Sequence, residues 1–348
     1  MTIFSKSSES FDEREVGMPA ILQELSALPT GLLPDAHPLA LEPVPRPRRV
    51  TVMTYDKLYK RIEQGMGIGH GSQYTPWLTI RRKNTSPSSG QVVSWMPPLN
   101  RDAHYFSVGE FHTALVLLWL GVQDLREQYP IWPVSHPHPL VGAAGTETNN
   151  YPWAQGLATI ADAAYIRHGT EVGSDVLYVA SIDLLATVPF EDGPRLAAFS
   201  SKPFNSTEVD VRWRTAERLE LERRYSTAIN ARYFVSSSAL VPPSLAANLE
   251  WWFDFSTLDL CPHLLPHVEK FANILNDHTD LGLNEVVPKA AQLCNITLQE
   301  GWLLFRHCAW HQLIDINPST TIRTSHPPPS GGRQLRQKWK EFLFGGEW

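Results

Sequence analysis

A strand–turn–strand–helix–strand run in the middle of the chain limits the fold more than any other feature. Residues 181–188 and 195–202 are mostly apolar, have the length of strands, and are separated by the turn sequence Glu191-Asp192-Gly193-Pro194. A helical stretch beginning at Thr215 and a strand at 232–235 follow. Strands that alternate with a helix in this way are typical of α/β domains, so we expect a mixed sheet with flanking helices.

Two further segments belong to this domain. Residues 175–179 are predicted to be a short strand that leads into the hairpin. Ser107 and Glu110 match a capping box, in which the serine caps the first turn of a helix and the glutamate bonds back to the N-cap amide. The apolar sequence that follows Glu110 and ends at Gly121 predicts a buried helix.

Four glycines stand at every second position from Gly65 to Gly71, after a helical stretch at 57–64. The spacing does not match the glycine fingerprint of dinucleotide-binding proteins, and no strand is predicted before it. We expect these glycines to allow a tight path of the backbone.

After Pro242-Pro243 the chain changes in character. Helical stretches are predicted at 244–254, 263–276 and 284–294. A second capping box, from Thr297 to Glu300, opens another helix, and residues 314–324 read as strand, turn and strand. Helices followed by such a hairpin are typical of a winged-helix domain, which we therefore predict here.

These patterns divide the chain into four parts. The parts are a flexible N-terminal arm at 1–50, an α/β domain at 51–240, a helical, winged-helix-like domain at 241–328, and a linker with a tail at 329–348. The arm ends in basic residues, which either contact phosphate or form a solvated linker. The tail carries an apolar stripe that is predicted to bind a partner protein, and docking onto the chain's own domain is the alternative.

Composition narrows the function classes. A net charge of −6 does not favour a protein that holds DNA tightly by itself, because cationic side chains are needed to neutralise phosphates. A DNA-binding role then requires a locally basic face, or a partner that brings the chain to DNA. Three widely spaced cysteines suggest neither a zinc ribbon nor a disulfide framework, and the first residues show no apolar signal segment. We expect a cytoplasmic protein with no membrane-spanning segment.

The hairpin also carries the residue types that hydrolyse phosphodiesters. That reaction needs a divalent metal, an activated water and a cation that offsets the charge of the transition state. Asp183 lies on the first strand, and Ser200 and Lys202 are predicted to share one face of the second. Glu110 could add a second carboxylate, and Mg²⁺ prefers such oxygen ligands. The spacing alone also fits a cross-strand ion pair between Asp183 and Lys202, with Glu110 as a helix cap.

Other polar and aromatic residues are weaker candidates. Glu220 and Glu222 could assist the site from the following helix, although a solvated face paired with neighbouring arginines is the simpler interpretation. His307 and His311 stand four residues apart on one helix, but the glutamate of the metalloprotease motif is not between them. His136 and His138 are expected to be solvated, and Trp251, Trp252, Trp302 and Trp310 are expected in the core.

Three long motifs are more specific than these spacings. They are LYKRIEQGMGIGHGSQYTPWLTIRR, VQDLREQYPIWP and AERLELERRYSTAINARYFVSSSALVPPSLAANLEWW. The motifs closely resemble segments of TnsA, the endonuclease subunit of heteromeric transposases, and they occur in the order of that family over residues 55–255. The resemblance implies a restriction-endonuclease-like fold of the PD-(D/E)XK nuclease superfamily in the domain at 51–240.

The resemblance also assigns roles to single residues. Glu110 in FSVGEFHTALVLL and Asp183 in SIDLLATV fall on the family's metal-binding carboxylates, and Lys202 in AFSSKP falls on its catalytic lysine. The family usually has glutamine where this chain has Ser200, a poor metal ligand, which leaves the main-chain carbonyl of Ser201 as the donor there. Ser200 is then at most an auxiliary group, and Mg²⁺, or Mn²⁺ in its place, is the expected cofactor.

The implied function is the endonuclease subunit of a transposase. Such a subunit cuts transposon-end DNA near the 5′ ends, while a TnsB-type recombinase cuts and joins the 3′ ends and a TnsC-type AAA+ ATPase regulates the complex. The resemblance implies a bacterial cytoplasmic protein that lies at the nucleoid when active. Two alternatives stay open: a catalytically inactive adaptor between recombinase and regulator, which the serine at position 200 favours, and a restriction or repair nuclease of the same fold.

Overall fold

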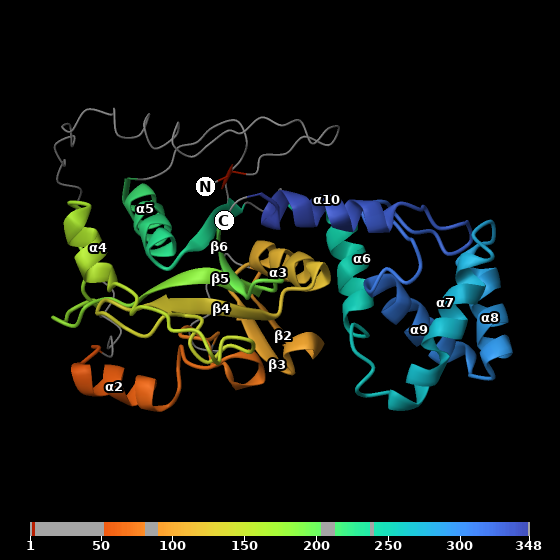
Figure 1. Ribbon diagram of the computed structural model, residues 1–348, viewed down its shortest axis with the longest axis horizontal. Helices are drawn as coiled ribbons and strands as arrows, with labels where there is room; N and C mark the ends of the chain where they lie inside the picture. Colours follow the sequence, from red (N-terminus) through yellow and green to blue (C-terminus); the bar gives the residue numbers. More distant parts are fainter. Residues whose placement is uncertain (1, 4–51, 81–89, 203–212, 237–239, 347–348) are drawn as a thin grey trace, which may run out of the picture.

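The computed structural model describes residues 2–3, 52–80, 90–202, 213–236 and 240–346, and it shows a mixed α/β half followed by a helical half (Figure 1). Helix α3 (Val108–Leu120) covers one face of the main sheet. Helices α4 (Leu157–Ala163) and α5 (Trp213–Ala228) cover the other face. The predicted mixed sheet with flanking helices is therefore confirmed.

The main sheet has the strand order β1-β7-β6-β5-β4. Its strands are β1 (Thr2–Ile3), β4 (Asp124–Ile131), β5 (Ala180–Val188), β6 (Arg195–Ser201) and β7 (Ala231–Ser236). Strands β4, β5 and β6 pair antiparallel, whereas β7 pairs parallel with β6 and with β1. The apolar hairpin predicted from the sequence is the β5–β6 pair, and the strand predicted at 232–235 is β7.

Helix α3 is buried along most of its length. Ser107 caps its start by accepting a hydrogen bond from the Glu110 amide, and Gly121 ends it with a φ of 88°. The sheet packs on one side of α3 and helix α6 (Pro243–Phe253) of the helical half contacts it as well, so the two halves share one continuous core. This explains why the helix is apolar around its whole circumference.

The remaining elements of the α/β half frame the sheet. They are α2 (Tyr55–Glu63), the 3-10 turns η1 (Gly71–Gln73) and η2 (Pro97–Leu99), and the antiparallel ribbon of β2 (Val92–Met96) and β3 (Arg101–Tyr105). The four glycines of the segment from Gly65 to Gly71 all have positive φ, and a Cβ on Gly67 would lie 2.5 Å from Cγ of Pro130. The tight backbone path predicted there is confirmed.

The helical half continues after α6. It consists of η3 (Pro262–His267), α7 (Val268–Asn276), α8 (Leu283–Cys294), α9 (Leu298–Trp310) and α10 (Gly332–Phe344). These helices match the predicted stretches, and the capping box of Thr297 and Glu300 is formed in both directions. The strand–turn–strand predicted at 314–324 is wrong, because the structure describes that whole segment and forms no strand in it. Without this hairpin, the winged-helix assignment is not confirmed.

Hydrogen bonds to asparagine side chains take the place of hairpin pairing in residues 314–324. The Asn248 amide donates to the main-chain oxygens of Pro318 and Thr320, each at 2.8 Å. The Asn317 carboxamide oxygen accepts from the amide of Ser319 at 2.9 Å. Main-chain groups that a hairpin would pair with each other are thus bonded to asparagine side chains instead.

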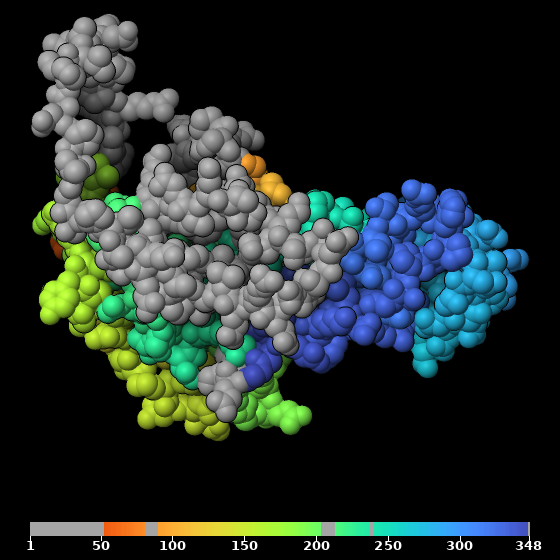
Figure 2. All heavy atoms as spheres, turned by 90° about the horizontal axis from the view of Figure 1, so that it is seen from above, coloured from red at the N-terminus to blue at the C-terminus, as the bar shows by residue number. Residues whose placement is uncertain are grey.

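The tail helix α10 folds back from the helical half onto the α/β half, as Figures 1 and 2 show. At its start, the amide of Arg333 donates to the Asp315 carboxylate at 2.9 Å. At its end, the Arg232 guanidinium of β7 donates to the main-chain oxygen of Leu343 at 3.1 Å. Trp339 and Leu343 are buried, so much of the apolar stripe packs on the chain's own core. Binding of a partner by this tail stays a prediction.

Three further predictions concern a short strand, the N-terminal arm and membrane-spanning segments. The predicted strand at 175–179 is wrong, because this segment forms a single bridge, between Leu177 and Thr170, and β5 begins at Ala180. The predicted flexible arm at 1–50 lies outside the described residues, apart from β1. Among the helices that the structure describes, none is long and apolar enough to cross a membrane.

Candidate active site

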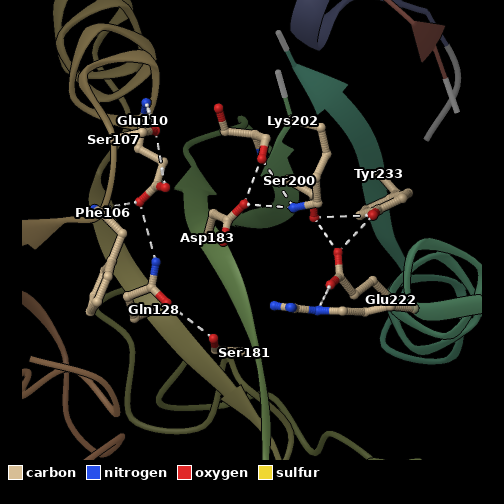
Figure 3. A network of polar contacts seen from close by, with 12 residues as sticks. Phe106, Ser107, Glu110, Gln128, Ser181, Asp183, Ser200, Lys202, Glu222 and Tyr233 are labelled. Carbon is tan, nitrogen blue, oxygen red and sulfur yellow. Dashed lines mark hydrogen bonds and ion pairs between the residues drawn. The ribbon is translucent and has the colours of Figure 1, made fainter. Parts of the chain in front are cut away.

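The β5–β6 pair brings three of the predicted site residues together. The amide of Ser201 donates to Asp183 Oδ2 at 2.7 Å, and Lys202 Nζ donates to the same oxygen at 3.2 Å (Figure 3). Lys202 Nζ also donates to the main-chain oxygen of Ser201 at 3.0 Å. The ion pair between Asp183 and Lys202 that the spacing allowed is therefore formed. Its chemical role depends on the groups around it.

Glu110 approaches this point from the first turn of α3 (Figure 3). Its Oε2 accepts from the amide of Phe106 at 2.9 Å, and its Oε1 accepts from the Ser107 hydroxyl at 3.1 Å. In a capping box the glutamate would bond back to the amide of Ser107, but here it reaches one residue further. The reciprocal capping box predicted here is therefore not formed: Ser107 caps α3, whereas Glu110 bonds to the residues before the helix and points its carboxylate toward Asp183.

The electrostatics of the site are those of two carboxylates that repel each other. Burial and the nearby charge of Asp183 raise the pKa of Glu110 to about 7. Burial alone would lower the pKa of Lys202, but the charges of Asp183 and Glu222 outweigh it, so this pKa is raised. The Lys202 ammonium therefore stays charged, and its single positive charge does not balance the two carboxylates of Glu110 and Asp183.

The oxygen atoms at this point fit a hard divalent cation. Mg²⁺ prefers carboxylate and carbonyl oxygens and keeps several waters, and Glu110, Asp183 and the Ser201 carbonyl are such donors. In the part of the chain that the structure describes, no three His, Cys, Asp or Glu side chains group as metal ligands. An ion here would therefore depend on the main-chain carbonyl and on water. The pKa of Glu110 is raised first by burial and then by the charge of Asp183, and a bound cation would oppose both by favouring the ionised carboxylate.

A second polar cluster lies on the α5 side of β6. Glu222 accepts hydrogen bonds from the hydroxyls of Ser200 and Tyr233, and Arg218 Nε donates to its other oxygen at 3.2 Å. The Tyr233 hydroxyl lies 3.0 Å from Ser200 Oγ. Ser200 and Glu222 are almost fully buried. This cluster ties helix α5 to the strand that carries Ser201.

The same cluster corrects two predictions. Glu222 does not belong to a solvated helix face, because α5 packs on the sheet through the side that carries it. Ser200 does not present its hydroxyl beside the ammonium of Lys202, since the hydroxyl is bonded to Glu222. The strand alternation that predicted a shared face ends at Ser201, where β6 ends.

Gln128 and Ser181 belong to the site but were not predicted. Gln128 Nε2 donates to Glu110 Oε2 at 3.3 Å, and the Ser181 hydroxyl donates to Gln128 Oε1 at 3.0 Å (Figure 3). Gln128 has a φ of 48° inside β4. It lies in the motif VQDLREQYPIWP, but no local pattern predicts a left-handed glutamine in a strand, because this conformation is rare for residues other than glycine and asparagine.

The other candidate polar residues have structural partners. Glu220 is paired with Arg223 and Arg224, as predicted. The rings of His307 and His311 lie within hydrogen-bond distance of main-chain oxygens of the segment between α6 and η3, at 2.8 and 2.7 Å.

The prediction of solvated histidines at 136 and 138 is wrong. His136 Nε2 lies 2.9 Å from the Tyr225 hydroxyl, and His138 Nε2 lies 3.1 Å from the main-chain oxygen of Ile229. Both rings are buried because their loop packs against α5 and its C-terminal end. The four tryptophans that were predicted to lie in the core are in it or packed against it, with Trp252 and Trp310 buried and Trp251 and Trp302 half-buried.

Comparison with known proteins gives the site a context. No family model matches the chain. A curated relative is the Transposon Tn7 transposition protein TnsA of Escherichia coli, which is 30% identical over 226 residues. The alignment covers 64% of this chain and 72% of that protein, so the similarity extends well beyond a local motif.

Proposed function

Because this chain belongs to the TnsA family, we propose that it is the DNA endonuclease subunit of a heteromeric transposase. Its substrate is transposon-end DNA, which it cuts near the 5′ ends. A TnsB-type recombinase cuts and joins the 3′ ends, and a TnsC-type AAA+ ATPase regulates the complex. The site of action is the nucleoid in the bacterial cytoplasm.

The observation that carries this proposal is the arrangement of Glu110, Asp183 and Lys202. Two buried carboxylates from different elements face each other, and the partly buried ammonium of Lys202 contacts one of them. A single ion pair that only stabilised the β5–β6 hairpin would not need Glu110, whose pKa is raised by burial and, to a smaller extent, by the charge of Asp183. The mixed sheet with its flanking helices supports a restriction-endonuclease-like fold around this site.

The residues of the site have separate tasks in this proposal. When bound, a divalent metal such as Mg²⁺, or Mn²⁺ in its place, polarises a phosphodiester and makes water a stronger nucleophile. Glu110, Asp183 and the Ser201 carbonyl would hold it. The Lys202 ammonium offsets negative charge that develops on the phosphate, and its raised pKa keeps it protonated. Glu222 and Ser200 tie α5 to β6 and so keep Ser201 and its neighbour in place.

The net charge of −6 supports a nuclease that depends on its partners. Non-specific DNA affinity comes mainly from cations that neutralise phosphates, and this chain carries more acidic than basic side chains. Delivery by the recombinase and the regulator would supply the missing affinity. It would also restrict cutting to assembled transposon ends.

Replacement of Asp183 tests the assignment directly. In a transposition assay with recombinase, regulator and Mg²⁺, Asp183→Ala should abolish 5′-strand cutting while 3′-strand joining continues. The product should then change from a simple insertion to a fused donor–target molecule. Asp192→Ala is a matched control, because Asp192 lies in the turn of the same hairpin with 67% of its side chain exposed. Clean excision by Asp183→Ala would show that the assignment is wrong.

The same experiment separates the alternatives. A catalytically inactive adaptor, which Ser200 in place of the family's glutamine favours, would give the fused product with the unmodified protein as well. A restriction or repair nuclease would cut without the recombinase, and its gene would have no recombinase and AAA+ ATPase genes beside it.

A further inference from the structure

In strand β4, the side chains that face one side of the sheet before Gln128 face the other side after it. Leu125 packs in the core on the α3 side, whereas Tyr129 packs in the core on the α4–α5 side, although an even spacing should place both on one face. Gln128 lies between them with a φ of 48°, in the left-handed region. A left-handed residue reverses the alternation, and L-residues with side chains rarely adopt this conformation inside a strand.

In the neighbouring strand β5, the side chains change face at the position opposite Gln128. In β5, Leu184 packs on the α3 side and Ile182 on the α4–α5 side. The ladder pairs Glu127 with Leu184 and Tyr129 with Ile182, so Gln128 lies opposite Asp183 between these pairs. The irregular point of the sheet therefore coincides with the candidate active site. Strained backbone is often found where a structure must aim a functional group.

With the backbone in this conformation, the side chain of Gln128 bridges Glu110 and Ser181. Its amide nitrogen donates to Glu110 Oε2 at 3.3 Å, and its amide oxygen accepts from the Ser181 hydroxyl at 3.0 Å. Because an ionised carboxylate can only accept, the nitrogen end of the amide faces Glu110, and the oxygen end is left to accept from the serine hydroxyl. Gln128 and Ser181 are both buried, at 3% and 1% exposure, so water does not compete for these bonds.

A purely structural role explains these features less well. An apolar side chain would fill a buried position between two core clusters without needing partners, and a regular strand residue would avoid the left-handed conformation. No hydrogen bond joins Gln128 to Lys202 or Asp183 in the network of Figure 3. Its link to the site runs through one oxygen of Glu110, the oxygen that also accepts from the Phe106 amide.

We propose that Gln128 is a positioning residue that holds the Glu110 carboxylate opposite Asp183, so that the two carboxylates can bind one divalent cation. Outer groups that orient a metal ligand commonly affect metal affinity as strongly as they affect activity. This inference rests on the proposed function, since it assumes that Glu110 and Asp183 form the metal site.

The test measures Mn²⁺ binding to the purified full-length protein by calorimetry, without DNA, alongside 5′-strand cleavage with the partner subunits. Gln128→Met keeps the unbranched shape and removes both hydrogen bonds. It should weaken Mn²⁺ affinity and slow cleavage by about tenfold or more each. Gln123→Met is the matched control, because Gln123 is exposed just before β4 and outside the site, and it should change neither quantity.

A double variant separates positioning from general structure. In a Glu110→Ala background, Gln128→Met should cause no further loss of Mn²⁺ affinity, because the residue it positions is gone. A further loss of the same size in that background would overturn the proposal. Ser181→Ala frees the other end of the amide and should shift Mn²⁺ affinity in the same direction if Gln128→Met does not fold.

Two outcomes distinguish this inference from the proposed function. If Glu110→Ala weakens Mn²⁺ binding but Gln128→Met and Ser181→Ala behave like the Gln123→Met control, the positioning role is refuted and the metal site stands. If neither Glu110→Ala nor Asp183→Ala weakens Mn²⁺ binding, the metal site itself is refuted, and the role of Gln128 with it.

Discussion

Replacing Glu110 by glutamine should remove a pH-dependent loss of stability that this carboxyl group imposes on the fold. Burial and the charge of Asp183 raise the folded-state pKa of Glu110 from its ordinary value of 4.5 to about 7. The folded state therefore holds the proton more tightly than the unfolded state does. Stability is unaffected below the unfolded pKa and is lost as the pH rises from 4.5 through about 7.

The size of the effect follows from these two pKa values. The whole difference corresponds to about 3 kcal/mol, and about 2.5 kcal/mol of it falls between pH 5 and pH 8. Glutamine cannot ionise, and its amide oxygen can still accept from Phe106. Any hydrogen bond that the glutamine amide makes less well than the carboxyl group lowers the stability of the variant by the same amount at both pH values. This loss therefore cancels when the stabilities at the two pH values are subtracted.

The assay is urea unfolding at pH 5 and pH 8 in the presence of a chelator, on the unmodified protein and on Glu110→Gln. The free energy of unfolding of the variant, relative to the unmodified protein, should rise by about 2.5 kcal/mol from pH 5 to pH 8. Glu191→Gln, in the exposed turn between β5 and β6, is the control and should show no such change. The reasoning is refuted if Glu110→Gln and Glu191→Gln have the same pH dependence.

Two further predictions concern the lysine and the tail. Lys202→Ala should slow single-turnover cleavage by about a hundredfold or more, because it removes the cation that offsets transition-state charge. Ser200→Ala should stay within about tenfold, since its hydroxyl bonds to Glu222 and not to the carboxylate pair, and equal losses would contradict this ordering. Trp339→Ala should lower the free energy of unfolding by about 3–5 kcal/mol, because this side chain is buried, as urea unfolding would show. Phe342→Ala, at 39% exposure, should lower stability clearly less than Trp339→Ala does and should weaken capture of the regulator or recombinase in a pull-down, and unchanged capture would count against a partner-binding tail.

Features set by neighbouring residues in the chain could be predicted from the sequence. The apolar runs and the turn at Glu191-Asp192-Gly193-Pro194 predicted the β5–β6 hairpin, and Ser107 and Gly121 predicted both ends of α3. Caps, turns and the periodicity of apolar side chains are local, so a short window of sequence contains the information for them. Glu110, Asp183 and Lys202 could be picked out as candidates because long motifs around them resemble a family, and the hairpin then places two of them side by side.

Only the tertiary structure decided which polar groups meet. The sequence suggested a solvated Glu222, a solvated His136 and a hairpin at 314–324, and each prediction failed because the decisive partner lies far away in the chain. The left-handed backbone of Gln128 is the clearest case, since β4, β5 and α3 must all be in place before its amide has Ser181 and Glu110 to bridge. The energy that holds a residue in a rare conformation comes from such distant contacts, so a short stretch of sequence around the residue cannot predict that conformation.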